Sequence, residues 1–210
     1  QQHGLEDNTL FIFTSDNGSH GMAGNDQSRF PFGSVRELYG HAMNGDWRGI
    51  KGEMFEGGHR VPLIVRWPGV VEPGTVSDRL VVLEDIMATV AAIIGAELPP
   101  GSAEDSFNLL PYLDGSHVGA SIREYAVLVT FGGHPVVRRG PWVLSFHTGT
   151  GREPRGDAEP LQAGRGRLHN LRKDPAQRVN FWLAYPEIVR ELTDLYEAHM
   201  ERGSSVGIDR

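Results

Sequence analysis

The chain has 210 residues, of which 39% are hydrophobic and 22% are charged, so it is long enough to bury a core without disulfide bridges. Its net charge of -7 argues against a nucleic-acid-binding surface, because contact with many phosphates requires an excess of cationic side chains. The absence of cysteine excludes disulfides, thiolate metal ligands and cysteine nucleophiles within these residues.

In the first part of the chain, two short apolar runs predict strands on either side of a long irregular segment. Leu10 to Phe13 is rich in strand-forming residues and ends in the polar turn of residues 15–18. From Ser19 to Gly58 the periodicity is lost and glycine recurs, which is typical of a functional loop. Val61 to Trp67 then predicts a second strand.

A helix is expected next, from Leu83 to Ile94. Apolar residues at positions 86, 87, 90, 93 and 94 share one face of it, and Gly95 is a typical helix stop. The apolar stretch Met87 to Ala96 is far shorter than the roughly 20 residues that a membrane-spanning helix needs. We therefore expect no membrane span here.

The second part of the chain reads as a small antiparallel sheet closed by a helix. Pro186 begins an amphipathic helix that ends at Gly203. We divide the chain into an α/β portion at 1–120 and a small α+β portion at 121–210. The expected strands are Tyr125–Phe131, Val136–Arg138, Trp142–Phe146 and Arg167–Leu171.

Asp16 and Asn17 directly follow the first strand, at the kind of edge where open α/β sheets bind ligands. Adjacent carboxylate and amide oxygens suit a hard cation such as Ca²⁺ or Mg²⁺. The same four residues, Ser-Asp-Asn-Gly, are also ordinary turn formers. From the residues alone, a metal site and a simple turn are both open.

Lys51 lies between glycines in the irregular segment and is one of only two lysines in the chain. An ammonium group that backbone can approach closely is a suitable ligand for an oxyanion. A solvated surface lysine is the alternative that the local sequence leaves open.

The first part of the chain contains four motifs, Phe13-Thr14-Ser15-Asp16-Asn17-Gly18, Arg48-Gly49-Ile50-Lys51-Gly52, Glu56-Gly57-Gly58-His59-Arg60-Val61-Pro62 and Arg66-Trp67-Pro68-Gly69. Together they resemble the sulfatases of type I, the arylsulfatase-like members of the alkaline phosphatase superfamily. Further downstream, residues 104–115 and 168–171, together with Lys173-Asp174-Pro175, are similar to C-terminal segments of that family. The resemblance spans nearly all of the chain, but only the later part of a complete sulfatase.

The resemblance implies the C-terminal part of an alkaline-phosphatase-like α/β sheet with flanking helices, followed by a small antiparallel sheet and a C-terminal helix. It implies hydrolysis of aryl or carbohydrate sulfate esters. By the same resemblance, Asp16 and Asn17 correspond to ligands of the active-site Ca²⁺, with Mg²⁺ as the alternative. Lys51 corresponds to a residue that binds the sulfate and neutralises charge in the transition state.

The nucleophile of this family is a formylglycine made from the Cys or Ser of a Cys/Ser-x-Pro-x-Arg motif, which these 210 residues do not contain. We therefore expect an N-terminal portion of the same polypeptide to supply it and Gln1 to lie within a longer sequence. The chain alone is expected to bind calcium weakly and to be inactive, because one Asp and one Asn are too few ligands.

Four further residues are candidates near this site. His20 lies three residues past Asn17 and either lines the substrate pocket or is solvated. Arg48 either contacts the sulfated ligand or belongs to a structural network. Glu56 and Arg60 are expected to pair and to hold Lys51 in position.

Two other functions remain open. The first is hydrolysis of phosphate or phosphonate esters within the same superfamily, since a metal, basic residues and an activated nucleophile serve either anion. The second is a truncated, non-catalytic module. By resemblance, a complete protein of this kind acts in the periplasm, outside the cell or in lysosomes.

Overall fold

A computed structural model of the chain describes residues 3–20, 38–153 and 166–206. Part of the predicted irregular segment, residues 21–37, lies outside this range. Contacts group the chain into two compact units, one of residues 1–14, 62–126 and 197–210 and another of residues 15–61 and 127–196. The linear division at residue 120 stays a prediction about the complete protein.

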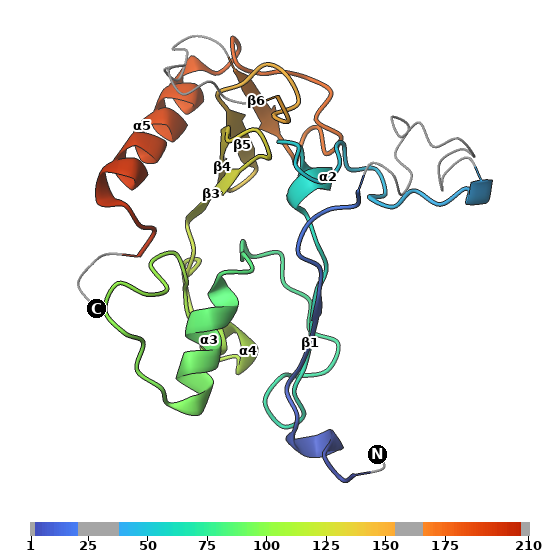
Figure 1. The fold of residues 1–210 in the computed structure, drawn as a ribbon, viewed down its shortest axis with the longest axis vertical. Helices are drawn as coiled ribbons and strands as arrows, with labels where there is room; N and C mark the ends of the chain where they lie inside the picture. The colour runs from blue at the N-terminus through green and yellow to red at the C-terminus, as the bar shows by residue number, and fades with distance from the viewer. Residues whose placement is uncertain (1–2, 21–37, 154–165, 207–210) are drawn as a thin grey trace. The chain divides into compact units, whose positions relative to one another are not determined.

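The first unit contains a two-stranded antiparallel ribbon. A short 3₁₀ helix, η1 (Glu6–Asn8), precedes β1 (Phe11–Thr14), which pairs with β2 (Leu63–Arg66) in the register Phe11 to Arg66 and Thr14 to Leu63. Strand β2 falls within its predicted run, and β1 is displaced by one residue from the predicted Leu10 to Phe13. Figure 1 shows β1 as part of this long, thin ribbon.

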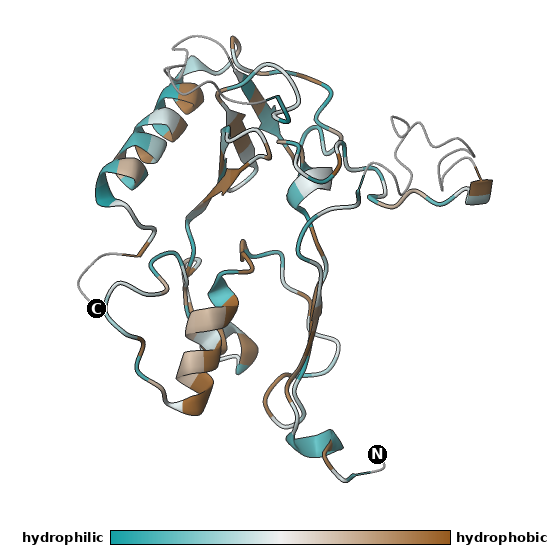
Figure 2. Cartoon of the chain, in the orientation of Figure 1, coloured by the Kyte–Doolittle hydropathy of each residue, from teal (hydrophilic) through white to brown (hydrophobic). Residues whose placement is uncertain are grey.

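Two helices of this unit, α3 (Asp85–Ile94) and α4 (Leu110–Leu113), lie close together. Gly95 terminates α3 at φ 66°, as predicted. Apolar residues of β1, β2, α3 and α4 line a small cavity of about 30 Å³. Figure 2 shows α3 as hydrophobic over most of its surface.

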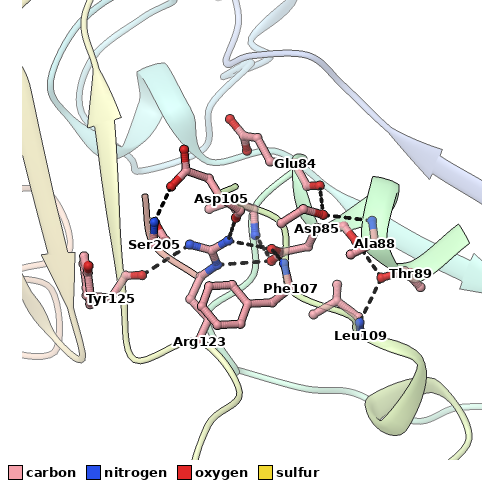
Figure 3. Close-up of polar contacts among 12 residues, drawn as sticks. Glu84, Asp85, Ala88, Thr89, Asp105, Phe107, Leu109, Arg123, Tyr125 and Ser205 are labelled. Carbon is pink, nitrogen blue, oxygen red and sulfur yellow. Dashed lines mark hydrogen bonds and ion pairs between the residues drawn. The ribbon is translucent and has the colours of Figure 1, made fainter. Parts of the chain in front are cut away.

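The apolar residues predicted to share one face of α3 are not all buried. Met87, Val90 and Ile94 are exposed in the structure, whereas Asp85 and Thr89 are buried. Of the buried positions of α3, Asp85, Ala88 and Thr89 make hydrogen bonds in a polar network that includes Arg123 (Figure 3), and Ala91 is buried as well. Polar contacts, which a hydrophobic pattern does not reveal, therefore hold part of the covered face of this helix.

The second unit contains most of a four-stranded sheet, whose strands are β3 (Tyr125–Val129), β4 (Pro135–Arg139), β5 (Trp142–Ser145) and β6 (Arg167–Asn170). The strand order is β3-β4-β5-β6, and β5 is antiparallel to both β4 and β6. The helix α5 (Pro186–Arg202) covers one face, as Figure 1 shows. Strands β4, β5 and β6 lie within one residue of the ranges predicted for them, whereas β3 ends two residues before its predicted end at Phe131.

Alternation along the strands gives each face of this sheet its own core. Val137, Leu144 and Leu168 face α5 and pack with its Leu192 and Tyr196. On the opposite face, a second core is formed by Met54, Phe55, Val136, Val143 and Leu171. Since Met54 and Phe55 closely follow Lys51, this second core fixes the loop that carries the candidate site.

Candidate active site

The Asp16–Asn17 turn begins two residues beyond the end of β1. Ser15 Oγ donates to the carbonyl oxygen of Asn17 at 3.0 Å and to Asp16 Oδ1 at 3.5 Å. Asn17 Nδ2 donates to the carbonyl oxygen of Gly18 at 3.1 Å, which orients the side-chain amide. Asp16 is exposed and Asn17 is half-buried. The turn thus presents a carboxylate and an amide oxygen from consecutive residues.

Three hydrogen bonds join this turn to the loop that carries Lys51. The Gly18 N–H donates to the carbonyl oxygen of Gly58 at 3.1 Å, and the Lys51 N–H donates to that of Ser19 at 2.8 Å. The Ser19 N–H donates to Asn44 Oδ1 at 3.1 Å. The residues expected to bind a metal and an anion therefore lie on neighbouring backbone segments.

Glycine makes this close approach feasible. A Cβ at Gly18 would overlap the carbonyl oxygen of Gly57, and a Cβ at Gly57 would lie 2.7 Å from the carbonyl oxygen of Arg48. Likewise, a Cβ at Gly58 would lie 2.8 Å from the carbonyl oxygen of Ile50. Both Gly57 and Gly58 belong to the short helix α2 (Glu56–His59). The loop and α2 thus pack backbone against backbone, with no space for side chains.

Lys51 is exposed, whereas residues 53–55 are buried. The Ile50 N–H donates to Glu53 Oε2 at 3.2 Å, and burial raises the pKa of this carboxyl group. Met54 and Phe55 are 2% and 1% exposed. Of the ion pairs between described residues, none involves Lys51. The loop is therefore fixed on one side of Lys51 and leaves its ammonium group accessible.

Glu56 and Arg60 form the pair that the sequence predicted. Glu56 Oε2 lies 3.2 Å from Arg60 Nη1, and Glu56 Oε1 lies 2.7 Å from Arg138 Nη1. The Arg60 guanidinium also lies over the ring of Trp47, 4.3 Å from its centroid. The Glu56 carboxylate thus joins α2 to strand β4 through Arg138 and, through Arg60, to the turn around Trp47.

Arg48 and His20 were the candidates with two open interpretations. Arg48 Nη1 donates to the carbonyl oxygen of Gln177 at 2.9 Å, and its guanidinium lies 3.9 Å from the centroid of the Phe55 ring. Burial lowers the pKa of Arg48 from its ordinary value. These contacts favour the structural interpretation of Arg48. His20 is exposed, just beyond the Asp16–Asn17 turn.

Gln177 contacts this loop from the C-terminal part of the chain and was not predicted from the sequence. Gln177 is fully buried, and its Oε1 accepts a hydrogen bond of 2.7 Å from the N–H of Glu56. Its backbone is left-handed at φ 50°, which is uncommon for a residue with a side chain. The preceding Lys173-Asp174-Pro175 turn was the only local signal, because a contact 121 residues apart leaves no trace in local periodicity.

Asp16 and Asn17 provide only part of the ligand set that a divalent metal needs. Asp16 and Asn17 offer two hard oxygen donors, and Ca²⁺ takes six to eight. Among residues 3–20, 38–153 and 166–206, no group of three or more histidine and acidic side chains is arranged to hold a metal ion. Any metal held at Asp16 and Asn17 would therefore need further ligands from outside these residues.

Comparison with known proteins connects this geometry to one family. A family model described as Sulfatase matches residues 1–96. An N-acetylgalactosamine-6-O-sulfatase of Bacteroides thetaiotaomicron is 34% identical over 201 residues, which cover 92% of this chain and 37% of the relative. Steryl-sulfatase of Rattus norvegicus is 41% identical over 122 residues, which cover 58% of this chain and 19% of the relative.

Solved structures agree with the sequence matches. A structure from Bacteroides thetaiotaomicron, described in connection with the metabolism of multiple glycosaminoglycans, gives a TM-score of 0.73 at 31% identity and covers 94% of this chain and 40% of its own. The PsFucS1 sulfatase from Pseudoalteromonas gives 0.69 at 26% identity, over 95% of this chain and 38% of its own.

The chain belongs to the sulfatase family. It spans less than two fifths of the length of the N-acetylgalactosamine-6-O-sulfatase and matches the C-terminal part of its relatives. The predicted α/β fold is confirmed by these structural neighbours. In addition, none of the helices within the described residues is long and apolar enough to span a membrane.

Proposed function

We propose that the complete protein is a sulfuric ester hydrolase and that this chain supplies Asp16, Asn17 and Lys51 to its active site. The observation that carries the proposal is the hydrogen-bonded contact between the Asp16–Asn17 turn and the Lys51 loop. Two motifs separated by more than 30 residues are thereby held next to each other. Membership of the sulfatase family supports the same assignment.

Lys51 is the residue proposed to hold the sulfate group. Its ammonium is exposed, and its loop is fixed by buried Met54 and Phe55, so the cation is positioned before substrate arrives. A fixed positive charge stabilises the negative charge that develops on the sulfate oxygens as the ester bond breaks. Glu56 and Arg60 are proposed to support this position by tying α2 to its surroundings.

Asp16 and Asn17 are proposed to contribute two ligands of Ca²⁺, with Mg²⁺ as the alternative. When bound, such a cation acts as a Lewis acid that polarises the sulfate and the attacking group. The Asp16 carboxylate would supply the negative charge and the Asn17 amide oxygen a neutral donor. Further ligands and the formylglycine nucleophile are expected from the N-terminal portion of the same polypeptide.

The proposed substrates are aryl or carbohydrate sulfate esters. This choice rests on the names of the relatives, which include an N-acetylgalactosamine-6-O-sulfatase and arylsulfatases. Exposed His20 is proposed to lie at the edge of the substrate pocket, whereas Arg48 is proposed to act mainly by supporting the loop. A location in the periplasm, outside the cell or in lysosomes is proposed on the family resemblance alone.

The function can be tested on the purified complete protein with 4-nitrophenyl sulfate, N-acetylgalactosamine 6-sulfate and 4-nitrophenyl phosphate. Lys51→Ala should lower kcat/KM for a sulfate ester by roughly 100-fold to 1000-fold, the usual effect of removing one group that stabilises the transition state. Lys173→Ala replaces the only other lysine, which donates to the Tyr185 hydroxyl at 3.1 Å, and serves as the matched control.

Three results would count against the proposal. The first is hydrolysis of the phosphate ester alone, which would favour the phosphatase alternative. The second is an equal loss of activity in both lysine variants. The third is a complete protein that folds and hydrolyses none of the three esters, which would favour a non-catalytic module.

A further inference from the structure

The turn between β3 and β4 lies directly against the residue that follows Lys51. The turn is closed by hydrogen bonds from the Thr130 N–H to the carbonyl oxygen of His134 and from the Gly133 N–H to that of Thr130, both of 3.0 Å. The Phe131 N–H donates to the carbonyl oxygen of Gly52 at 3.0 Å. From the sequence, Phe131 was predicted only to end a strand.

Gly52 permits this contact because it has no side chain. Its φ is 84°, and a Cβ at this position would lie 2.8 Å from the Cβ of Phe131. The side chain of Phe131 therefore begins directly above the backbone of Gly52 and next to Lys51. A glycine is required after Lys51 because an aromatic residue of the neighbouring hairpin approaches the backbone there.

A third segment holds both parts in place. The Gly132 N–H donates to the carbonyl oxygen of Gly151 at 2.9 Å, and the Met54 N–H donates to that of Thr150 at 2.9 Å. In addition, the His134 ring bonds through Nε2 to the carbonyl oxygen of Glu153 at 2.8 Å. Residues 150–153 thus bind the hairpin turn on one side and the Lys51 loop on the other, so Phe131 and Lys51 belong to one connected framework.

Despite this fixed backbone, the side chain of Phe131 is 81% exposed. Single exposed apolar residues are common, and Leu183 in the same unit is 90% exposed. What distinguishes Phe131 is that its backbone is fixed from two sides and lies against Gly52, the residue after exposed Lys51. Because this backbone is already fixed, only the side-chain rotamers lose freedom when a ligand covers the ring, so contact with a flat apolar surface is favourable.

We propose that Phe131 is a specificity-determining residue that packs against the ring of the alcohol part of the substrate while Lys51 holds the sulfate. The inference rests on the proposed function and adds to it the residue that contacts the ring of an aryl or carbohydrate sulfate ester. An aryl ring or the apolar face of a sugar fits against a phenyl ring, whereas an inorganic anion gains nothing from it. Phe131 then contacts the alcohol part of the ester, and Lys51 binds its sulfate group.

The test compares Phe131→Ala and Phe131→Trp in the complete protein, using whichever of 4-nitrophenyl sulfate and N-acetylgalactosamine 6-sulfate the parent hydrolyses. Phe131→Ala should raise KM about tenfold and leave kcat within about twofold, because it removes binding that ground state and transition state share. Phe131→Trp should restore KM. Competitive inhibition by inorganic sulfate should be unchanged in both variants but weakened in Lys51→Ala. Leu183→Ala is the control for loss of an exposed apolar side chain.

An unchanged KM in Phe131→Ala would overturn the inference. So would a lowered melting temperature with a loss of kcat that Phe131→Trp does not restore, because this would show that Phe131 only packs against other parts of the protein. In both cases the proposed function stands if Lys51→Ala is still impaired. A parent protein that hydrolyses neither ester refutes the proposed function, and the inference fails with it.

Discussion

Asp85 and Arg123 in the first unit and Asp16 and Lys51 in the second are residues of similar chemistry in opposite environments. Asp85 is fully buried and Arg123 is 2% exposed, whereas Asp16 and Lys51 are exposed. The Asp85 carboxylate accepts two bonds from Arg123, at 2.5 Å and 3.2 Å, and one from each of two backbone N–H groups. Figure 3 shows this network around α3.

The two units use charge for different purposes. In the network of Asp85, the Asp85 carboxylate and the Arg123 guanidinium are occupied by partners within the chain, so this pair contributes to structure. In the site loop, close backbone packing at glycines 18, 57 and 58 provides the structure and leaves Asp16 and Lys51 accessible. Substitutions in the two regions should therefore separate stability from activity.

The largest expected effect is on stability, from Asp85→Asn. This change leaves the Arg123 guanidinium buried without a compensating charge, and such losses cost about 3–5 kcal/mol in unfolding free energy. Chemical denaturation of the complete protein measures it. Glu6→Gln is the control, because the Glu6–Arg66 pair is about half exposed at 3.5 Å and should contribute less than about 1 kcal/mol. Equal effects of the two variants would contradict the comparison.

The second effect is a dependence of stability on pH that His169 causes. Its Nδ1 donates to the carbonyl oxygen of Val179 at 2.8 Å, and burial, with Arg167 and Arg48 nearby, lowers the pKa of His169 to about 4. The unfolded chain binds this proton near pH 6.5 and the folded chain only near pH 4. Stability should therefore fall as the pH drops from 6.5 to 4, by on the order of 3 kcal/mol in total.

Denaturation at pH 7 and pH 4.5 tests this for the parent and for His169→Asn, whose amide can still donate to Val179. The variant should lose much less stability between the two pH values than the parent does. His41→Asn is the control, because His41 is exposed. If parent and His169→Asn show the same pH dependence, His169 is not the buried neutral group described above.

The third effect concerns Gly18, where the backbone of the Asp16–Asn17 turn meets that of α2. In Gly18→Ala, the new Cβ overlaps the Gly57 carbonyl oxygen, so the two segments must separate. We expect a loss of about 1–3 kcal/mol in stability and a loss of kcat of roughly 100-fold, because misplacement of active-site groups by about 1 Å is sufficient for that. Gly45→Asn is the control, since a Cβ there meets nothing within 4 Å and Asn tolerates its φ of 57°.

Local sequence patterns predicted most of the regular structure. The consecutive apolar residues Val136-Val137 and Val143-Leu144 indicate that both faces of the sheet are buried, because neighbouring residues of a strand point to opposite faces. Gly95 marks the end of α3. Position after a strand and between glycines made Asp16, Asn17 and Lys51 candidates, and the motif resemblance then implied their roles. The short helices α2 and α4 were missed, because four residues are too few to show a helical period.

Contacts between distant residues were beyond prediction from the sequence. The covered side of α3 depends on Arg123, which lies 38 residues from Asp85. The anchoring of the Lys51 loop depends on Gln177 and on the sheet face that receives Phe55. Such partners are chosen by the tertiary fold, and no property of the single residue distinguishes Gln177 from a surface glutamine.

The smallest effect is expected from Arg60→Ala, and it shows how much of the site loop depends on exposed charge. Glu56 would lose a partner that is 49% exposed but keep Arg138, which is 20% exposed and lies closer at 2.7 Å. We expect less than about 1 kcal/mol in stability and at most a few-fold change in kcat/KM. Arg138→Ala should exceed both values, because it removes the less exposed partner. If Arg60→Ala instead abolishes activity while stability is unchanged, Arg60 contacts the substrate, and its role is not to position the loop.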